Sequence, residues 1–332
     1  MSGQKSNEML AAVYEKTGVP ADVLSVRSIK RPDVGAGQVR VKVAFSGINP
    51  TDVKFRGGRT TRPIDGFQVP HVDGSGTIDA VGPGVDLTRI GQRVWVLLAA
   101  HESKWGTAAE WAVVNQDRAI PLPDSVSFEL AATLGVPAVT AANCVLGDGP
   151  VSGLDVLVAG GAGAVGSCAV QLARWQGARV AATVSGSAKA EIARQAGADY
   201  VVNYRDTDAI SQLQTWSTKV ARIIEVDLAA NLDIDLAVAA PGATIVTYAA
   251  PGEDPVLPTR RLMTAGVCLR FMLLYTLPAP LLAAAIEVVR AALVADVLQL
   301  PSIQVFALND IVAAHDAQEA GPIGRVLVEL PQ

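Results

Sequence analysis

A glycine cluster stands between an apolar run and a segment with helical spacing. Residues 159–166 read AGGAGAVG, the run DVLVA ends at residue 159, and SCAVQLARWQG follows. After Gly160 the pattern G-x-G-x-x-G is filled by Gly161, Ala162, Gly163, Ala164, Val165 and Gly166. Glycines at a strand-to-helix turn allow a tight bend and let the backbone approach a pyrophosphate group. A flexible apolar loop is the alternative, but the flanking strand and helix favour a dinucleotide site.

Two kinds of pattern divide the chain. Over the first 120 residues or so, short runs with alternating apolar residues, such as 38–47, 74–82 and 92–99, are separated by Gly, Pro and Asp clusters. This pattern predicts an antiparallel β module. From about residue 154, apolar runs at 155–159, 178–184, 222–226 and 243–249 alternate with helix-like segments. That alternation predicts an α/β fold with a parallel, doubly wound sheet, and the strand, helix and strand of 304–330 resemble the first module.

Composition limits the class of protein. The chain has 332 residues, of which 50% are hydrophobic, so we expect two domains with large cores. A net charge of -5 gives no basic surface for nucleic acid. Three scattered cysteines without C-x-x-C fit a reducing, cytoplasmic location rather than a disulfide framework. The apolar stretch 267–300 is interrupted by charges and prolines, and the N-terminus lacks a signal-peptide core, so we expect no membrane segment.

The end of the second parallel strand predicts which dinucleotide binds. NAD sites place an acid there, whereas a 2'-phosphate needs donors and positive charge. The stretch 184–191 reads VSGSAKAE, with Ser185 and Lys189 as donors and no acid at the strand end. Tyr204, after the strand-like run 199–203, is a further donor for the same phosphate. These residues predict NADPH, although Lys189 alone is equally well explained as a solvated helix residue.

Seven motifs in order carry a resemblance to a known family. They are GINPTDVKFRGG (47–58), GSGTIDAVGPGV (74–85), GQRVWV (91–96), GTAAEWAVV (106–114), ATLGVPAVTA (132–141), VLVAGGAGAVG (156–166) and GRVLVEL (324–330). The chain resembles the quinone oxidoreductase branch of the medium-chain dehydrogenase/reductase superfamily. The resemblance implies a GroES-like catalytic domain made from residues 1–131 and 299–332. A Rossmann NADP-binding domain, 132–298, is inserted between them, with a cofactor cleft between the two domains.

The same superfamily contains zinc alcohol dehydrogenases. At the positions of their catalytic zinc ligands this chain has Asn49, Val72 and Val136. Valine cannot ligate a metal, so we expect no metal site. His71 lies one residue from a ligand position, and we interpret it as a surface or cleft-edge histidine.

The resemblance implies an NADPH-dependent reductase of a quinone or other α,β-unsaturated carbonyl. Asn49 would lie near the nicotinamide ribose and donate to the substrate oxygen, although an Asn before Pro50 is also typical of a turn. Many relatives have a tyrosine where Lys54 stands, so Lys54 is a candidate cation for the developing anion or a solvated lysine. The alternatives are an enoyl-thioester reductase and a dinucleotide-binding redox sensor or structural protein with little turnover.

Further residues are assigned by the resemblance alone. Thr140, Tyr248 and Phe271 fall where relatives line the nicotinamide and ribose, although each also fits a core position at a strand end. Residues 266–274 resemble the edge strand through which relatives pair their sheets, which implies a homodimer or a dimer of dimers. The small-molecule substrate pocket would be formed by variable loops such as 98–104.

Overall fold

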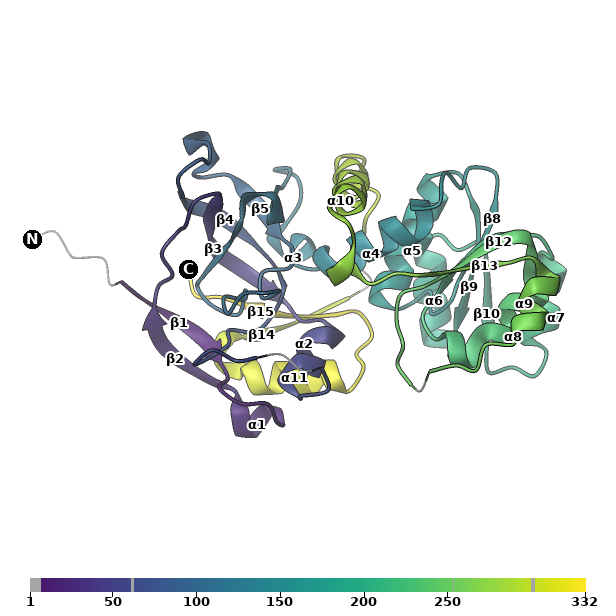
Figure 1. Cartoon of the computed structure of the whole chain (residues 1–332), viewed down its shortest axis with the longest axis horizontal. Coiled ribbons are helices and arrows are strands. Elements are labelled where there is room, and N and C mark those ends of the chain that lie inside the picture. Colours follow the sequence, from purple (N-terminus) through teal and green to yellow (C-terminus); the bar gives the residue numbers. More distant parts are fainter. Residues whose placement is uncertain (1–6, 61–62, 253, 300–301) are drawn as a thin grey trace, which may run out of the picture. The chain divides into compact units, whose positions relative to one another are not determined.

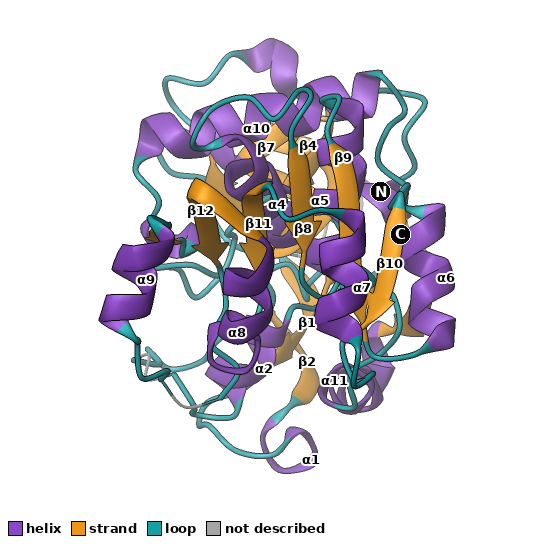
Figure 2. Cartoon of the chain, turned by 90° about the vertical axis from the view of Figure 1, so that its right-hand side faces the viewer, coloured by secondary structure: helices purple, strands orange, loops and turns teal. Residues whose placement is uncertain are grey.

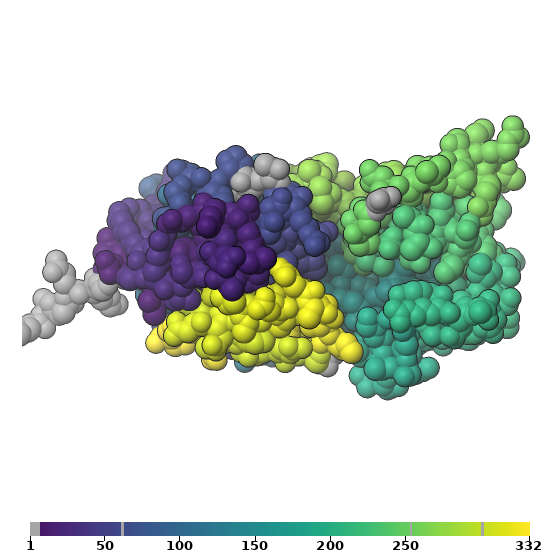
Figure 3. All heavy atoms as spheres, turned by 90° about the horizontal axis from the view of Figure 1, so that it is seen from below, coloured from purple at the N-terminus to yellow at the C-terminus, as the bar shows by residue number. Residues whose placement is uncertain are grey.

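The computed structural model describes residues 7–60, 63–252, 254–299 and 302–332, and these form two compact units. Unit 1 contains Met1–Val136 and Ser302–Gln332, and unit 2 contains Pro137–Pro301. The boundaries fall a few residues after the expected ones at 131 and 298. Both chain ends therefore belong to unit 1, where the yellow C-terminal elements pack against purple and blue N-terminal ones (Figures 1 and 3).

Unit 1 is built on a mainly antiparallel sheet. The strand order is β14-β15-β3-β4-β5-β7, β6 also pairs with β3, and β1 and β2 form a separate hairpin. Because β15 pairs with β3 antiparallel, with Leu327 opposite Gly47, the C-terminal segment is part of the same sheet. The strands are β1 (Glu8–Val13), β2 (Ser25–Lys30), β3 (Gln38–Gly47), β4 (Asp73–Val81), β5 (Arg93–Val96), β6 (Trp111–Asn115), β7 (Ala119–Pro121), β14 (Ile303–Ala307) and β15 (Arg325–Glu329).

Short helices connect and cover these strands. They are α1 (Pro20–Val23), α2 (Pro50–Arg56), α3 (Phe128–Ala131) and α11 (Ile311–Glu319), with 3-10 turns η1 (Leu87–Arg89), η2 (Gln116–Arg118) and η4 (Leu308–Asp310). Helix α2 begins after Asn49 because Pro50 suits the first helical position, where no N–H is needed. Helix α11 packs against α2 and β15, which brings residues from both chain ends together in one core.

One expected strand is shorter than its apolar pattern. The run 92–99 predicted a strand, but β5 ends at Val96, so the prediction was wrong for the last three residues. Leu98 has a φ of 57°, a left-handed conformation that ends an extended strand. The N–H of Ala99 then donates to the carbonyl of Val72 instead of continuing the ladder. Residues 97–99 are therefore apolar because they are buried, although they do not belong to the strand.

Unit 2 is a parallel sheet with the order β10-β9-β8-β11-β12-β13, and helices cover both of its faces (Figure 2). The strands are β8 (Asp155–Val158), β9 (Arg179–Val184), β10 (Tyr200–Asn203), β11 (Val220–Glu225), β12 (Ala239–Thr247) and β13 (Cys268–Phe271). The helices are α4 (Gly135–Leu146), which begins at the end of unit 1, α5 (Ala164–Trp175), α6 (Ser187–Gln195), α7 (Ala209–Trp216), α8 (Leu228–Val238), α9 (Thr259–Ala265) and α10 (Ala279–Val294), with the 3-10 turn η3 (Leu274–Thr276).

The doubly wound fold is confirmed, and its sequence pattern has a simple cause. Because helices lie on both faces, the central strands are almost continuously apolar, and Leu157, Ile223 and Ile245 are fully or almost fully buried. The strand order reverses direction between β8 and β11, and dinucleotides bind at such a switch point, beyond the carboxyl ends of the strands. No helix in the described ranges is long and apolar enough to cross a membrane.

Candidate active site

The glycine cluster forms the turn between β8 and α5. Gly160 has a φ of 67°, in the left-handed region that favours glycine, and its carbonyl accepts the N–H of Gly163 at 2.9 Å. Gly163 is the N-cap of α5. The N–H groups of the first helical turn, from Ala164 onward, have no partner within the helix, so they are donors for an anion. The turn has the geometry that a pyrophosphate site requires.

Two of the glycines are fixed by close packing. A Cβ on Gly161 would lie 2.5 Å from the Cβ of Ala182 on β9. A Cβ on Gly166 would lie 2.2 Å from the carbonyl oxygen of Gly160. Both distances are far below a van der Waals contact, and the atoms they meet belong to rigid groups. Any larger side chain at either position has to displace the turn.

The proposed phosphate donors gather at one end of the sheet. Ser185 follows β9, Lys189 lies exposed in the first turn of α6, and Tyr204 follows β10 with 40% of its surface exposed. The N–H of Tyr204 donates to the carbonyl of Val184 at 3.0 Å, which places it beside Ser185. The structure therefore brings the three residues to the carboxyl ends of two neighbouring strands.

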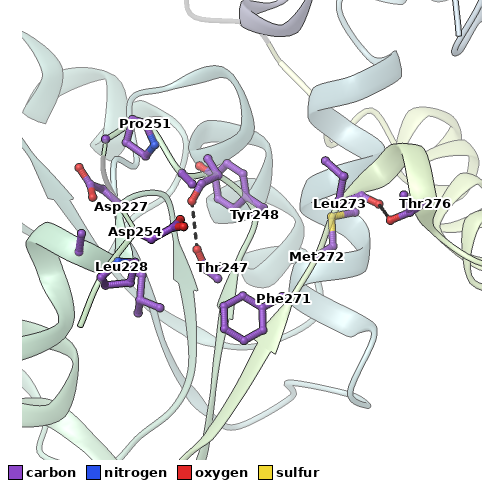
Figure 4. Close-up of a pocket in the computed structure, with 15 residues that line it drawn as sticks. Asp227, Leu228, Thr247, Tyr248, Pro251, Asp254, Phe271, Met272, Leu273 and Thr276 are labelled. Carbon is purple, nitrogen blue, oxygen red and sulfur yellow. Dashed lines mark hydrogen bonds between the residues drawn. The ribbon is translucent and has the colours of Figure 1, made fainter. Parts of the chain in front are cut away.

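A pocket of about 390 Å³ lies beyond the carboxyl ends of β11, β12 and β13 (Figure 4). Tyr248 and Phe271, both expected near the nicotinamide, line it together with Asp227. Phe271 is 68% exposed, and the Thr247 hydroxyl donates to the carbonyl of Ala249 at 3.2 Å. The residues expected to bind the 2'-phosphate follow β9 and lie near β10, so they and this pocket are on opposite sides of the switch point between β8 and β11.

Asn49 lies in unit 1 and is completely buried. Its Nδ2 donates to Asp73 Oδ2 at 2.8 Å, and its Oδ1 accepts from the Arg325 guanidinium at 3.0 Å. The same Asp73 oxygen accepts the backbone N–H of Val136 at 2.8 Å. The side chain of Asn49 is thus held at both ends, and one amide hydrogen is left for another acceptor.

Two buried acids titrate abnormally in this cluster. Burial raises the pKa of Asp73 to about 6, against the lowering effect of the Arg325 charge. Burial also raises the pKa of Asp52 to about 8, although its Oδ2 accepts the N–H of Asn49 at 2.8 Å. At neutral pH Asp73 therefore carries the negative charge that faces Arg325, and Asp52 is mostly protonated.

The sequence reasoning did not single out Asp73 or Arg325. Asp73 stands in the stretch HVDG, and Arg325 stands in GRVLVEL directly before the apolar run VLV. Such a charge in a buried strand needs a partner, because an unpaired buried charge is strongly unfavourable. The sequence therefore indicates that each of these charges needs a partner, but it does not show that Asp73 and Arg325, far apart along the chain, are partners of each other.

The donor set does not fit a zinc ion. Val72 and Val136 have no ligating atom, and the Asn49 amide is bound to Asp73 and Arg325. Within the described ranges, no group of three or more His, Cys, Asp or Glu side chains is arranged to hold a metal ion. Asn49 and the backbone N–H of Val136 donate instead to the carboxylate of Asp73.

The interpretation of His71 as a surface or cleft-edge histidine was wrong. His71 and His315 are fully buried, with their Nε2 atoms 3.0 Å apart, and the His71 Nδ1 lies 2.8 Å from the Ser46 hydroxyl. One imidazole has to donate and the other accept, so the accepting ring is neutral. Burial lowers the pKa of His71 well below its usual value and that of His315 to about 3. The pair belongs to the core between α11 and the sheet.

Two further expected residues lie on helices that begin beside the Asp73 network. Lys54 is partly buried in the last turn of α2, and Thr140 is 4% exposed within α4. Loop 98–104, which we expected to form part of the substrate pocket, borders a pocket of about 690 Å³ in unit 1. Its walls include the aromatic rings of Phe55 and Trp105 and the cationic side chain of Lys104.

Comparison with known proteins identifies the family. Residues 35–124 match the alcohol dehydrogenase GroES-like domain, and residues 164–290 match the zinc-binding dehydrogenase family. A quinone oxidoreductase of Sus scrofa is 30% identical over 280 residues, which are 83% of this chain and 82% of that protein. The chain belongs to the quinone oxidoreductase branch of the medium-chain dehydrogenase/reductase superfamily. It is therefore an oxidoreductase.

Solved structures of this branch agree with the fold. A mycobacterial quinone oxidoreductase superposes with a TM-score of 0.86 at 29% identity, covering 97% of this chain and 99% of that one. A mycobacterial relative in complex with NADPH gives a TM-score of 0.83 at 29% identity, with the same coverage. The family therefore uses a nicotinamide dinucleotide, and the glycine turn of unit 2 has the geometry to bind its pyrophosphate.

Proposed function

We propose that this oxidoreductase reduces a quinone or another α,β-unsaturated carbonyl with NADPH. The observation that carries the proposal is the hydrogen-bond network around Asp73, in which two of the three residues at the expected zinc-ligand positions, Asn49 and Val136, donate to the Asp73 carboxylate. A substrate that is already electron-poor needs a placed hydride and hydrogen bonds to its oxygen, but no strong Lewis acid. The residues at these positions favour that chemistry over alcohol oxidation.

The bound dinucleotide supplies a hydride from its nicotinamide ring. The N–H groups at the start of α5 bind the pyrophosphate, and Ser185, Lys189 and Tyr204 bind the 2'-phosphate. From the resemblance we assign to Asn49 the hydrogen bond to the substrate oxygen, through the amide hydrogen that Asp73 does not use. Because Asn49 is completely buried in this structure, its side chain has to become accessible when the substrate binds. Lys54 is the proposed cation that stabilises the developing negative charge.

The proposed oligomer is a homodimer or a dimer of dimers. Strand β13 is the edge of the sheet of unit 2. Its last residue, Phe271, is 68% exposed, and Leu273 after it is 53% exposed. An exposed apolar edge strand favours pairing with a second copy. The same surface supports a two-fold association in which two β13 strands lie side by side.

The reaction is tested by a panel of NADPH oxidation assays with the purified protein. We expect turnover with ortho- or para-quinones or with enones, and little with primary alcohols and NADP⁺. Preference for enoyl thioesters would indicate the alternative reductase. Tight NADPH binding without turnover of any acceptor would indicate a redox sensor instead.

The cofactor preference is tested by replacing Lys189 with alanine. We expect NADPH affinity to fall by about ten- to a hundredfold, because a charged hydrogen bond to the 2'-phosphate is lost, while NADH affinity stays nearly unchanged. Fluorescence titration of both cofactors measures the difference. Lys219→Ala is the control, since Lys219 is also exposed but precedes β11 at the amino end of the sheet. Equal losses for NADPH and NADH would refute the assignment.

A further inference from the structure

A chain of hydrogen bonds crosses the core of unit 1, from helix α11 to strand β4. His315 and His71 are joined through their Nε2 atoms, which are 3.0 Å apart. His71 Nδ1 lies 2.8 Å from the Ser46 hydroxyl, and that hydroxyl lies 2.7 Å from the hydroxyl of Thr107. The Thr107 hydroxyl donates to the backbone carbonyl of Asp73. All of these residues are 0% exposed, so solvent does not compete for these bonds.

The carbonyl at the end of the chain determines the direction of the bonds before it. A carbonyl oxygen can only accept, so the Thr107 hydroxyl donates to Asp73 and its oxygen accepts from the Ser46 hydroxyl. A hydroxyl has one hydrogen, so Ser46 has none left for His71, and the Nδ1–H of His71 donates to Ser46. The protonated nitrogen of His71 is therefore determined by a backbone group that does not titrate.

The direction of the contact between the two imidazoles follows from this tautomer. A His71 that also donated from Nε2 would be a buried cation, and no carboxylate among the described residues is hydrogen-bonded to either ring. Such an unpaired buried charge is strongly unfavourable, so the Nε2 of His71 accepts from the Nε2–H of His315. The Nδ1 of His315 is buried and has no hydrogen-bond partner in the part of the chain that the structure describes. The bonds thus run in one direction, from His315 to Asp73.

The chain holds a strained turn in front of β4. His71 has a φ of 75°, in the left-handed region, which is unfavourable for a residue other than glycine and persists only where its surroundings hold it. Its carbonyl accepts the N–H of Thr107 at 3.1 Å, and β4 begins two residues later with Asp73. The Asp73 carboxylate accepts from the Nδ2 of Asn49 at 2.8 Å. The bonds to both nitrogens of His71 therefore hold the turn that places Asp73 against Asn49.

The chain cannot carry a proton to a substrate, because it ends at a backbone carbonyl, which has no proton to release. We propose that His71 and His315 are positioning residues that hold the turn before β4 and thereby the Asp73 carboxylate against Asn49. This inference rests on the proposed hydrogen bond from Asn49 to the substrate oxygen. Through these bonds, a helix near the C-terminal end of the chain determines the position of that donor.

The tautomers are tested by nitrogen NMR of the whole protein with isotope-labelled histidine. The chain has three histidines, so the spectrum is simple, and the variants His101→Gln and His315→Gln assign its signals. At about pH 7 we expect the ring hydrogen of His71 on Nδ1 and that of His315 on Nε2. The opposite tautomer in either ring, or a cationic pair, would overturn the proposal. This measurement needs neither cofactor nor substrate.

The positioning role is tested by measuring kcat for two variants at His315, with a quinone or enone that the wild type reduces. Leucine removes the donor to His71, whereas the side-chain amide of glutamine keeps an N–H donor of similar reach. We expect kcat to fall at least about tenfold in His315→Leu and to stay within about threefold in His315→Gln, because a misplaced group stabilises the transition state less. Ile311→Val is the control on α11, since it removes one methyl group from the same core but no hydrogen bond. It should keep the wild-type kcat.

His71→Gly is a second test, in which the turn is not strained. Glycine adopts the left-handed conformation without steric cost but makes neither side-chain bond, so kcat should fall as in His315→Leu. Wild-type kcat in both variants, whatever their thermal stability, would show that the chain is only structural. A His315→Gln variant as slow as His315→Leu would show that the donor to His71 is not what matters.

The outcomes also separate this inference from the proposed function. A wild type that reduces neither quinones nor enones would overturn the proposed function and the positioning role with it, and the tautomers would still be measured by NMR. A wild type that is active, with tautomers other than those expected, would overturn this inference alone.

Discussion

Replacement of Gly166 by alanine is expected to weaken dinucleotide binding by more than about a hundredfold, because the added methyl group cannot fit. Its Cβ would lie 2.2 Å from the Gly160 carbonyl oxygen, and this oxygen also accepts the N–H of Gly163. The turn has to open, so the donors at the start of α5 lose their arrangement around the pyrophosphate. Isothermal titration with NADPH measures the loss of binding, and thermal unfolding measures the accompanying loss of stability.

Gly163→Ala is the matched control for stability. Its Cβ would lie 3.3 Å from the same Gly160 oxygen, a contact that a shift of a few tenths of an ångström relieves, and its φ of -74° suits alanine. This variant should unfold at nearly the wild-type temperature, whereas Gly166→Ala should unfold earlier. If Gly166→Ala binds NADPH like the wild type, the turn is not the pyrophosphate site.

Local sequence patterns predicted the elements that position this turn. The glycine cluster with its flanking strand and helix was recognisable because each glycine answers a local requirement, a bend at Gly160 and a close approach at Gly166. The parallel sheet was recognisable because strands covered on both faces are apolar throughout. Such signals lie within short windows of the chain. The resemblance to the family then predicted that residues from both chain ends form one domain and that the other domain is inserted between them.

The buried polar pairs were not predictable in the same way. Asn49 and Arg325 are 276 residues apart, and His71 and His315 are 244 apart, so only the fold brings them together. Histidine is intermediate between the residue types that are usually buried and those that are usually exposed, so its type alone does not predict burial. The predicted end of β5 was wrong because a buried loop and a buried strand give the same apolar pattern. The left-handed conformation of Leu98 also cannot be predicted from its residue type. Hydrophobic periodicity reports burial directly but backbone conformation only indirectly.

Replacement of Arg325 by methionine is expected to lower the free energy of unfolding by about 3–5 kcal/mol at neutral pH, because Asp73 is left as an uncompensated buried charge. The Arg325 guanidinium is almost completely buried, 4.0 Å from Asp73 Oδ2 and hydrogen-bonded to Asn49. Chemical denaturation of both proteins measures the difference. Arg261→Met is the control, since that arginine forms an exposed ion pair and its loss should change stability by no more than about 0.5 kcal/mol.

The cost of losing Arg325 should depend on pH. In the wild type the folded pKa of Asp73 is about 6, above that of an unfolded aspartate, so folding binds a proton and stability falls as the pH rises toward 6. Without Arg325 that pKa rises further, and stability continues to fall at higher pH. The difference in the free energy of unfolding between the two proteins should therefore be smallest near pH 5 and grow toward pH 8.

In the double variant Asp73→Asn, Arg325→Met the buried charge is absent, so the loss of unfolding free energy should be smaller than the sum of the losses in the two single variants. Additive losses, or a difference that does not change with pH, would show that Arg325 acts only by filling space.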